Sequence, residues 1–320
     1  MPDAIFTGDP NEIRVALAAS LGVGEVWQLA NGKAAFYDPA PRVAASSGEK
    51  QLLRTDGQCT VTKTNGVVIL DGGEVYWDHS ANSATYKPAN DRDFYLGTAV
   101  GDWASGDLQM TVNLNVKPVW LLDISRDPWV DVVLGTQAVG GLLPARPRGG
   151  SHNIAITATN EAQKVDMLSR FGFARTANAI AKLVFNVVSD GAGTVVDVSM
   201  GLANDTHATD ADTITESLFI HLNANDVNIY AESDDGTNEV AATDTTIDYT
   251  EGTPVEVWFD LRNEADIQIY VNAALVLGAS TFRLDNATGP LKLLVHVEKT
   301  ASTDTYSLDI NELKARIAEQ

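Results

Sequence analysis

Short runs of β-branched and aromatic residues recur along this 320-residue chain, separated by turns rich in Gly, Asp, Asn and Thr. The clearest run extends from Leu108 to Val116, where apolar and polar residues alternate strictly. Successive side chains of a strand point to opposite faces, so this pattern predicts one face on a core and the other in solvent. The stretch from Val255 to Leu261 repeats the pattern. The chain is therefore predicted to be all-β.

Residues 1–116 are predicted to form a first domain, a small β-barrel or β-rich module. Glu74–Asp78 and Phe94–Val100 are further clear strands of this domain, because both are rich in β-branched and aromatic residues. An early helix is expected over Glu12–Ala19, which contains good helix formers and an acidic residue in its first turn. Asn11 would cap this helix.

Residues 117–320 are predicted to form a second domain, an antiparallel β-sandwich of the jelly-roll, lectin-like kind. Prolines and glycines interrupt the strand pattern after Val116, and the segment at about 135–150 is expected to be rich in loops. Nine candidate strands follow. They cover residues 154–157, 181–188, 194–200, 217–222, 227–230, 254–261, 266–271, 291–297 and 306–310. The tail, Glu312–Ile317, fits either a last strand or a helical turn.

The charge of the chain argues against two classes of partner. It has 22 Lys and Arg against 43 Asp and Glu, a formal net charge of -21. Such a surface repels phosphate backbones and anionic membranes, so neither nucleic acid nor a membrane is expected as a partner. Between Leu183 and Leu261 there are 16 acidic residues and no Lys or Arg. This stretch is interpreted as an acidic face in contact with solvent. Calcium sites and adaptation to a salty medium are the more specific alternatives.

Cys59 is the single cysteine, so no intrachain disulfide and no thiolate metal cluster can form. The first residues lack the basic and apolar regions of a signal peptide. No apolar run approaches the ~20 residues that a membrane span needs. The chain is therefore expected to be made in a cytoplasm and to remain soluble.

Three neighbouring stretches of the first domain carry a resemblance to a known family. They are Gly72–Asp78, Phe94–Val100, and Ala104–Leu114 with its small-residue turn. The region of about residues 45–116 resembles the head decoration, or capsid cement, proteins of tailed phages. That family shows a Gly-x-x-Val-Tyr-Trp-Asp strand, a Gly-x-Ala-Val step and an alternating final strand. The resemblance implies a module that docks on a capsid lattice, as a homotrimer at three-fold positions.

The second domain is similar in outline to concanavalin-like sandwiches of the lectin and laminin-G type. The residues that carry this similarity are Glu256–Leu261, Ile267–Asn272 and Gly289–Val295. The similarity implies a fold only, because the same fold hosts many functions.

A search for catalytic patterns finds no nucleophile elbow, no phosphate-binding loop and no His-x-x-x-His spacing. His221 and His296 fall within candidate strands and are interpreted as ordinary sheet residues. Glycosidase chemistry needs two carboxylates ~5–5.5 Å apart in a retaining enzyme. Glu256 and Asp260 share a strand face but would lie ~13 Å apart. No catalytic residue is predicted, and the chain is not expected to be an enzyme.

Two sets of residues are weak candidates for binding. No cofactor is expected apart from calcium, which takes six to eight oxygen ligands. The candidate calcium ligands are the loop aspartates Asp205, Asp210, Asp212, Asp234 and Asp235. Trp258 is the candidate for glycan binding, because alternation places it opposite the apolar face of its strand, on the solvent side or in a second layer.

The leading hypothesis is a structural virion protein, made in the host cytoplasm, that decorates and stabilises a tailed-phage capsid. Its partners would be the major capsid protein and copies of itself, with the second domain projecting outward as a lectin-like sandwich. The alternative is a carbohydrate-binding protein that recognises cell-surface or environmental glycans through Trp258 and the acidic loops. A third hypothesis, a glycan hydrolase or lyase, would require turnover that depends on a single carboxylate.

Overall fold

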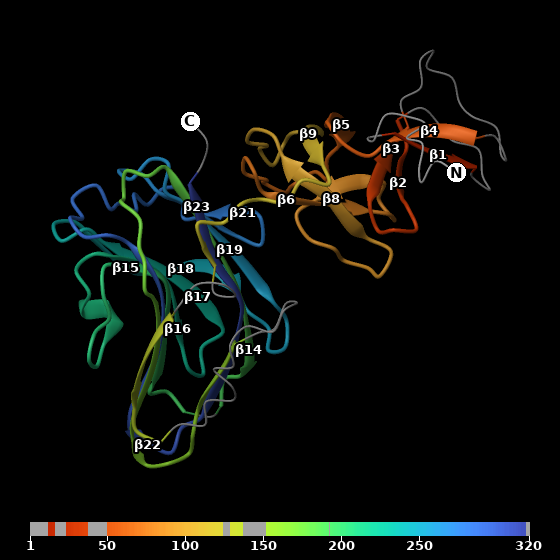
Figure 1. Cartoon of the computed structure of the whole chain (residues 1–320). Coiled ribbons are helices and arrows are strands. Elements are labelled where there is room, and N and C mark those ends of the chain that lie inside the picture. Colours follow the sequence, from red (N-terminus) through yellow and green to blue (C-terminus); the bar gives the residue numbers. More distant parts are fainter. Residues whose placement is uncertain are drawn as a thin grey trace, which may run out of the picture. The chain divides into compact units, whose positions relative to one another are not determined.

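The computed structural model of the chain describes residues 12–16, 24–37, 50–123, 129–136, 152–191 and 193–317. The chain divides into two compact units, Met1–Pro118 (unit 1) and Val119–Gln320 (unit 2). The predicted boundary after residue 116 lies two residues from this division. Apart from one short 3-10 turn, every regular element in the described residues is a strand (Figure 1). The all-β prediction is therefore confirmed, and no described helix has the length and hydropathy required to span a membrane.

Unit 1 begins with a four-stranded sheet of order β1-β4-β3-β2. Its strands are β1 (Glu12–Ala16), β2 (Val26–Gln28), β3 (Ala34–Phe36) and β4 (Lys50–Arg54). The prediction of a helix over Glu12–Ala19 is wrong, because Glu12–Ala16 pairs antiparallel with β4. Ile13 and Val15 have higher strand than helix propensity, and pairing with a neighbouring strand outweighs the local helix signals.

The second sheet of unit 1 has five strands in the order β5-β9-β8-β6-β7. They are β5 (Gln58–Thr62), β6 (Glu74–Asp78), β7 (Ser83–Thr85), β8 (Phe94–Ala99) and β9 (Gln109–Leu114). The alternation read from the sequence is confirmed in β9, where Met110, Val112 and Leu114 are buried. Leu108 lies outside the strand and is exposed. A core that includes Ala34 of β3 joins the two sheets.

Asn115 links the two sheets of unit 1 through its side chain. Its amide donates to the carbonyl oxygens of Ala34 and Thr55, and its Oδ1 accepts from the Ala34 backbone N–H. The residue has a positive φ of 56°, which Asn tolerates better than most residues. Because these bonds close a gap of 60 to 81 residues in sequence, Asn115 fixes the end of β9 against the first sheet.

Unit 2 is a sandwich of two antiparallel sheets, each with seven strands. The back sheet has the order β10-β23-β14-β19-β20-β21, with β12 beside β23. Its strands are β10 (Leu122–Asp123), β12 (His152–Ile156), β14 (Ala179–Ser189), β19 (Val255–Asp260), β20 (Gln268–Val271), β21 (Ala274–Val276) and β23 (Tyr306–Ile317). The tail Glu312–Ile317 is therefore part of a last strand, the first of the two predicted alternatives.

The front sheet has the order β11-β13-β22-β15-β16-β17-β18. Its strands are β11 (Trp129–Leu134), β13 (Glu161–Ser169), β15 (Val196–Ala203), β16 (Ser217–Asn223), β17 (Asn228–Asp234), β18 (Glu239–Asp248) and β22 (Lys292–Ser302). β13 and β18 lie outside the stretches predicted as strands. β18 is an edge strand whose side chains are mostly exposed, so it lacks the apolar alternation that marks a half-buried strand. Most of the loop-rich segment predicted at 135–150 lies outside the described residues.

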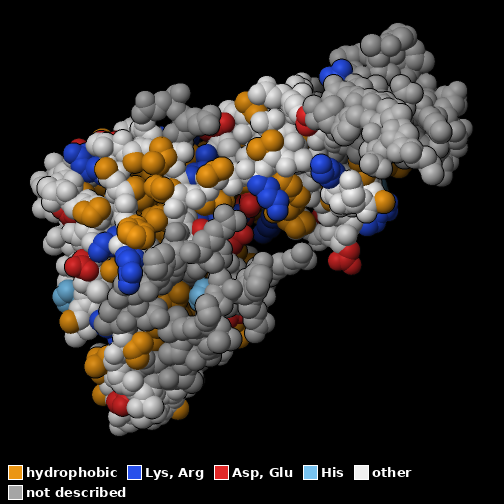
Figure 2. Space-filling model, in the orientation of Figure 1, with side chains coloured by type: hydrophobic (Ala, Val, Ile, Leu, Met, Phe, Trp, Pro, Cys, Tyr) orange, Lys and Arg blue, Asp and Glu red, His pale blue; other side chains and the backbone are white. Residues whose placement is uncertain are grey.

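One face of each sheet builds the core between them. Alternate residues of β15, from Val196 to Leu202, are buried against those of β19, from Val255 to Phe259. The residues between them point to the other face of their sheet, as period-2 alternation requires. In the view of Figure 2, basic, acidic and hydrophobic side chains are mixed on the surface. The candidate sites of unit 2 lie on the non-core face of the front sheet and in the loops at the ends of strands.

Candidate functional site

A row of polar side chains crosses the front sheet on the face opposite the core. Strand register places Asp166 of β13, His296 of β22, Ser199 of β15, His221 of β16 and Tyr230 of β17 next to one another in turn. Each is flanked in its own strand by buried core residues such as Val165 or Val198. We call this surface the polar face. The alternation that builds the core therefore also gathers these side chains.

The loop of residues 204–216, between β15 and β16, packs onto the polar face. Its Ala211 and Ile214 form a small apolar cluster with Leu168, Phe219 and Leu294 of the sheet. Asp210 caps a 3-10 turn, η1 (Ala211–Thr213), by accepting from the Asp212 backbone N–H. This loop buries a surface that would otherwise face solvent, which explains why the polar row lies inside the protein.

Under this loop, His296 forms a cluster with two carboxylates. Its Nδ1 lies 2.5 Å from Asp166 Oδ1 and its Nε2 lies 3.3 Å from Glu298 Oε2. Burial alone would lower the pKa of His296, but contacts with Asp166 and Glu298 outweigh it and raise the pKa to about 9. Lys164 Nζ lies 3.1 Å from Asp166 Oδ2. Asp166 is thus a buried carboxylate balanced by two cations.

A second cluster, which we call the His221 cluster, contains His221, Asp197, Asp212 and Glu232. His221 Nδ1 lies 3.4 Å from Asp212 Oδ1 and 3.7 Å from Glu232 Oε1, and its Nε2 lies 3.5 Å from Asp197 Oδ2. Burial would lower the pKa of His221, but the carboxylates raise it to about 11. Burial also raises the pKa of Asp197 to about 7. Asp197, Asp212 and His221 each offer a ligand atom within 4.8 Å of the others, as a metal ion requires.

Of the three aspartates predicted as calcium ligands in this region, the structure brings only Asp212 to a metal-capable cluster. Asp210 is occupied as the cap of η1. Asp205 accepts a hydrogen bond from the Thr206 backbone N–H. The contacts of Asp212 come from strands β15, β16 and β17 rather than from its neighbours in sequence. Calcium binding by these loop aspartates stays a prediction.

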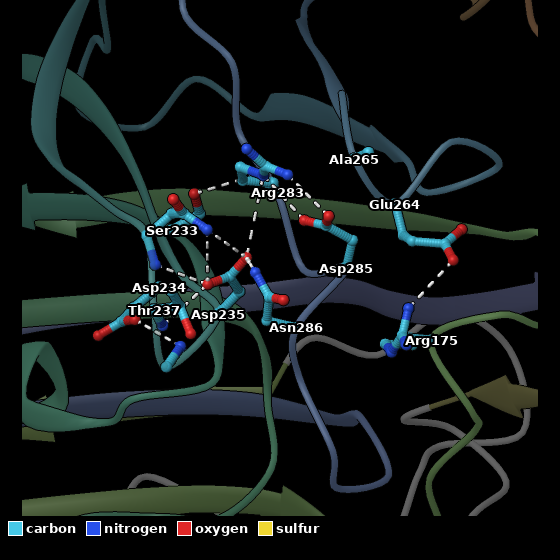
Figure 3. Close-up of polar contacts among 12 residues, drawn as sticks. Arg175, Ser233, Asp234, Asp235, Thr237, Glu264, Ala265, Arg283, Asp285 and Asn286 are labelled. Atoms are coloured by element: carbon cyan, nitrogen blue, oxygen red, sulfur yellow. Dashed lines mark hydrogen bonds and ion pairs between the residues drawn. The ribbon is translucent and has the colours of Figure 1, made fainter.

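Asp234 and Asp235, the other two calcium candidates, lie at the end of β17 (Figure 3). Asp235 is buried, and its carboxylate accepts from the backbone N–H groups of Thr237 and Asn238 and from the Asn286 side-chain amide at 2.9 Å. These bonds outweigh the effect of burial and hold the pKa of Asp235 well below its usual range. Because N–H donors bond both of its oxygens, the Asp235 carboxylate links the turn at Thr237 and Asn238 to Asn286 and is not arranged to bind a cation. Asp234 accepts from the Gly236 backbone N–H.

Asn286, whose side chain donates to Asp235, lines a pocket of about 530 Å³ at this end of the sandwich. It is lined by two loops with the residues Ala174, Arg175, Thr176, Asn286, Ala287, Thr288, Gly289 and Pro290. We call it the loop pocket. Reciprocal backbone hydrogen bonds of 2.9 Å between Phe173 and Leu291 hold the two loops side by side. Arg175 is oriented by an ion pair of 3.1 Å with Glu264, shown in Figure 3.

Glu216 fixes the wall of the loop pocket. Its Oε1 accepts from the Thr288 backbone N–H and hydroxyl, both at 2.8 Å, and its Oε2 accepts from the Gly289 backbone N–H at 2.9 Å. The Asn204 side chain donates to the same oxygen at 3.0 Å. These bonds lower the pKa of Glu216 although burial would raise it. No pattern in the sequence marks Glu216, because Thr288 and Gly289 lie more than 70 residues away in the chain.

Trp258 is not an exposed platform for a sugar. Only 8% of its surface is exposed, and its indole N–H donates to Glu256 Oε1 at 2.7 Å. The ring of Trp120 lies over it at 6.1 Å between centroids, and Lys182 Nζ lies 5.4 Å from its ring centroid. Alternation correctly placed Trp258 off the core face, in the second layer rather than in solvent. Glycan binding by Trp258 would require an exposed face of the indole ring, and the ring of Trp258 is buried.

Unit 1 has a groove of its own, with a volume of about 810 Å³. It lies between the two sheets of the unit and includes Trp27 of β2, Trp77 of β6 and Gln109 of β9. The Trp27 indole N–H donates to Glu25 at 3.1 Å. None of these residues was singled out as a binding residue from the sequence.

No family model matches the chain, and no curated protein matches it. Among solved structures, the carbohydrate recognition domain of Emp47p aligns with a TM-score of 0.43 and 13% identity, over 62% of this chain and 94% of that one. LamAcat from Zobellia galactanivorans aligns with a TM-score of 0.40 and 12% identity, over 61% and 96%. A protein of unknown function from Shewanella oneidensis MR-1 aligns at 0.40 and 15%, over 60% and 82%. These scores are too low to transfer a function or a site residue.

Proposed function

We propose that this chain binds carbohydrate through the loop pocket of unit 2 and does not convert it chemically. The observation that carries the proposal is the fixed, polar construction of this pocket. Glu216, Asp235 and the Phe173–Leu291 backbone pair hold its two loops in one arrangement. A site whose shape is set before binding loses less conformational entropy when a ligand enters.

The groups that line the loop pocket suit a ligand rich in hydroxyl groups. Arg175 supplies N–H donors, and Asn286 turns its amide nitrogen toward Asp235, which leaves its amide oxygen to accept (Figure 3). The N–H groups of Thr288 and Gly289 already bond Glu216, so residues 288–290 offer carbonyl oxygens as acceptors. Folds of this outline occur in a carbohydrate recognition domain and in LamAcat. The fold therefore does not distinguish a lectin from an enzyme, and the site must do so.

A glycan array with the full chain tests this proposal. The variant Arg175→Ala removes the guanidinium from the pocket. Arg262→Ala is the matched control, because Arg262 has a similar exposure and also pairs with a carboxylate, that of Asp260, outside the pocket. We expect binding to one class of glycan, lost at least tenfold in Arg175→Ala and kept in Arg262→Ala. Absence of binding, equal loss in both variants, or release of reducing ends from a bound glycan would contradict the proposal.

A second candidate function concerns unit 1 and does not compete with the first. We propose that unit 1 docks on a repeating capsid shell, as the resemblance of residues 45–116 to capsid decoration proteins implies. The observation that favours it is that the strands carrying the resemblance, β6, β8 and β9, are consecutive neighbours in one sheet. The major capsid protein and further copies of this chain, as a homotrimer on the virion surface, would be its partners. Sedimentation with expanded capsids that lack a decoration protein tests it, and a chain that stays in the supernatant would contradict it.

A further inference from the structure

Two buried atoms of the His221 cluster have no hydrogen-bond partner. They are His221 Nδ1 and Glu232 Oε1. The His221 side chain is 5% exposed and that of Glu232 is 10% exposed, so bulk water does not solvate these atoms freely. Buried polar atoms in folded proteins are nearly always paired, and an exception calls for an unseen water or ion.

The two atoms face each other from neighbouring strands, β16 and β17, at 3.7 Å. Asp212 Oδ1 approaches the same ring nitrogen at 3.4 Å from the covering loop. On the other side of the ring, Nε2 lies 3.2 Å from Asn223 Oδ1. Nε2 can keep its proton for Asn223 while an ion replaces the proton that Asp212 and Glu232 otherwise hold on Nδ1, so that the Nδ1 lone pair points toward these two carboxylates. A second hydrogen bond of this kind is how metal-binding histidines are usually oriented.

Even a protonated His221 balances only one of the carboxylates at this place. Three carboxylates, those of Asp197, Asp212 and Glu232, surround one imidazole. Among the described residues, no Lys or Arg forms an ion pair with any of the three. The sequence explains why: strands β15 to β18 and their loops fall within the stretch from Leu183 to Leu261, which contains no Lys or Arg.

We propose that the His221 cluster is a binding site for a divalent transition-metal ion, such as Zn²⁺ or Mn²⁺. His221 Nδ1, Asp212 and Glu232 are the ligands on one side of the ring, with Asp197 within reach of the same ion. One imidazole with carboxylates matches the ligands that these ions accept. Calcium prefers a shell made of oxygen atoms alone, so Ca²⁺ is expected to bind this site more weakly than Zn²⁺ or Mn²⁺. This inference concerns a different place from the loop pocket, so either can fail without the other.

The ion would also tie the covering loop to the sheet. Asp212 belongs to the loop of residues 204–216, whereas His221 and Glu232 belong to strands. An ion shared between them adds a link to the contacts of Ala211 and Ile214. Because the metal binds only the folded arrangement, it raises stability by mass action.

The test uses the full chain, stripped of metal with a chelator and dialysed. Calorimetric titration with ZnCl₂, MnCl₂ and CaCl₂ gives affinity and stoichiometry, and the visible spectrum of added Co²⁺ reports nitrogen and oxygen ligands. Asp212→Asn removes one ligand at a half-exposed position of the loop, and the amide keeps the size and shape of the side chain. Asp205→Asn is the matched control in the same loop, because Asp205 contacts only the next residue among its described hydrogen bonds.

We expect one Zn²⁺ or Mn²⁺ per chain, at least tenfold weaker binding of Ca²⁺, at least tenfold loss of affinity in Asp212→Asn, and unchanged affinity in Asp205→Asn. The proposal is overturned if the wild-type chain takes up none of these ions, if Ca²⁺ binds most tightly, or if the two variants behave alike. If a variant folds poorly, the titration of the wild-type chain with the three ions still supports or overturns the proposal.

Discussion

His296 on β22 lies directly opposite Asp166 on β13, and neither side chain is exposed to solvent. The pair sits beneath the loop of residues 204–216, where Thr206 donates its hydroxyl to Asp166. A buried charge pair resists separation, because removing one partner leaves the other charge without compensation. The pair therefore couples the covering loop and the front sheet to the protonation of one histidine.

Stability should fall as the pH rises above neutrality. The pKa of His296 is about 9 in the folded chain, above its usual 6.5, so its contribution is fully present below about pH 6.5 and is lost as the pH rises through about 9. The difference corresponds to up to about 3 kcal/mol in the free energy of unfolding. Urea unfolding of metal-free protein between pH 6 and 9.5 measures it. His296→Gln should reduce this slope without abolishing it, because His221, whose pKa is raised to about 11, contributes a decrease of the same sign. An unchanged slope would contradict the assignment.

Glu216→Gln should loosen the loop pocket. An amide cannot accept on both sides of its head group, so one of the donors at Thr288 or Gly289 loses its partner. We expect a loss of about 1–3 kcal/mol in the free energy of unfolding and weaker glycan binding. Glu239→Gln, on the exposed edge strand β18, is the control that should change neither. Equal effects of the two substitutions would argue against a specific role for Glu216.

Gly97→Ala should destabilise unit 1. A Cβ at Gly97 would meet the carbonyl oxygen of Asn113 on the paired strand β9 far inside normal contact, so the two strands would have to separate. We expect a cost on the order of 1–3 kcal/mol. Gly106→Ala is the matched control, because no atom lies within 4 Å of a Cβ at that position. A Gly97→Ala protein as stable as the control would show that the strand pair tolerates the methyl group.

Cys59 should be unreactive in the native chain. It is buried in the core of unit 1, and burial raises the pKa of its thiol to about 12, so almost no thiolate exists at neutral pH. A thiol reagent such as DTNB should label the unfolded chain at once and the native chain only as unit 1 opens. Because Cys59 is the single cysteine, the labelling rate reports on this unit alone. Rapid labelling of native protein would contradict the buried placement.

The sequence predicted much of the sandwich, because its strands bury one face and therefore alternate. β16 and β19 follow the predicted stretches closely. β13 was missed because Lys164 and Asp166 make it look like a polar segment, although the core buries one of its faces and the covering loop buries the other. The helix predicted over Glu12–Ala19 failed because pairing with β4 is a long-range contact that local propensity does not contain.

The candidate sites were harder to predict than the strands. Acidic residues close in sequence were grouped as calcium ligands, but Asp212 meets Glu232 and Asp197 because its loop folds over strands β15, β16 and β17. His221 and His296 were interpreted as ordinary sheet residues, whereas both lie among carboxylates. One signal was present: Asp197 and His221 alternate with apolar residues in strands that were correctly predicted. Alternation placed them on the non-core face, and only the order of strands shows that they meet.

A crystal structure of the full chain soaked with the glycan that binds best on the array tests the central claim most directly. The account predicts sugar density in the loop pocket, with contacts to Arg175 and to residues 286–290. An unaltered glycan should be seen there. A sugar bound elsewhere on the chain, a cleaved product, or a pocket without sugar at saturating concentration would contradict it.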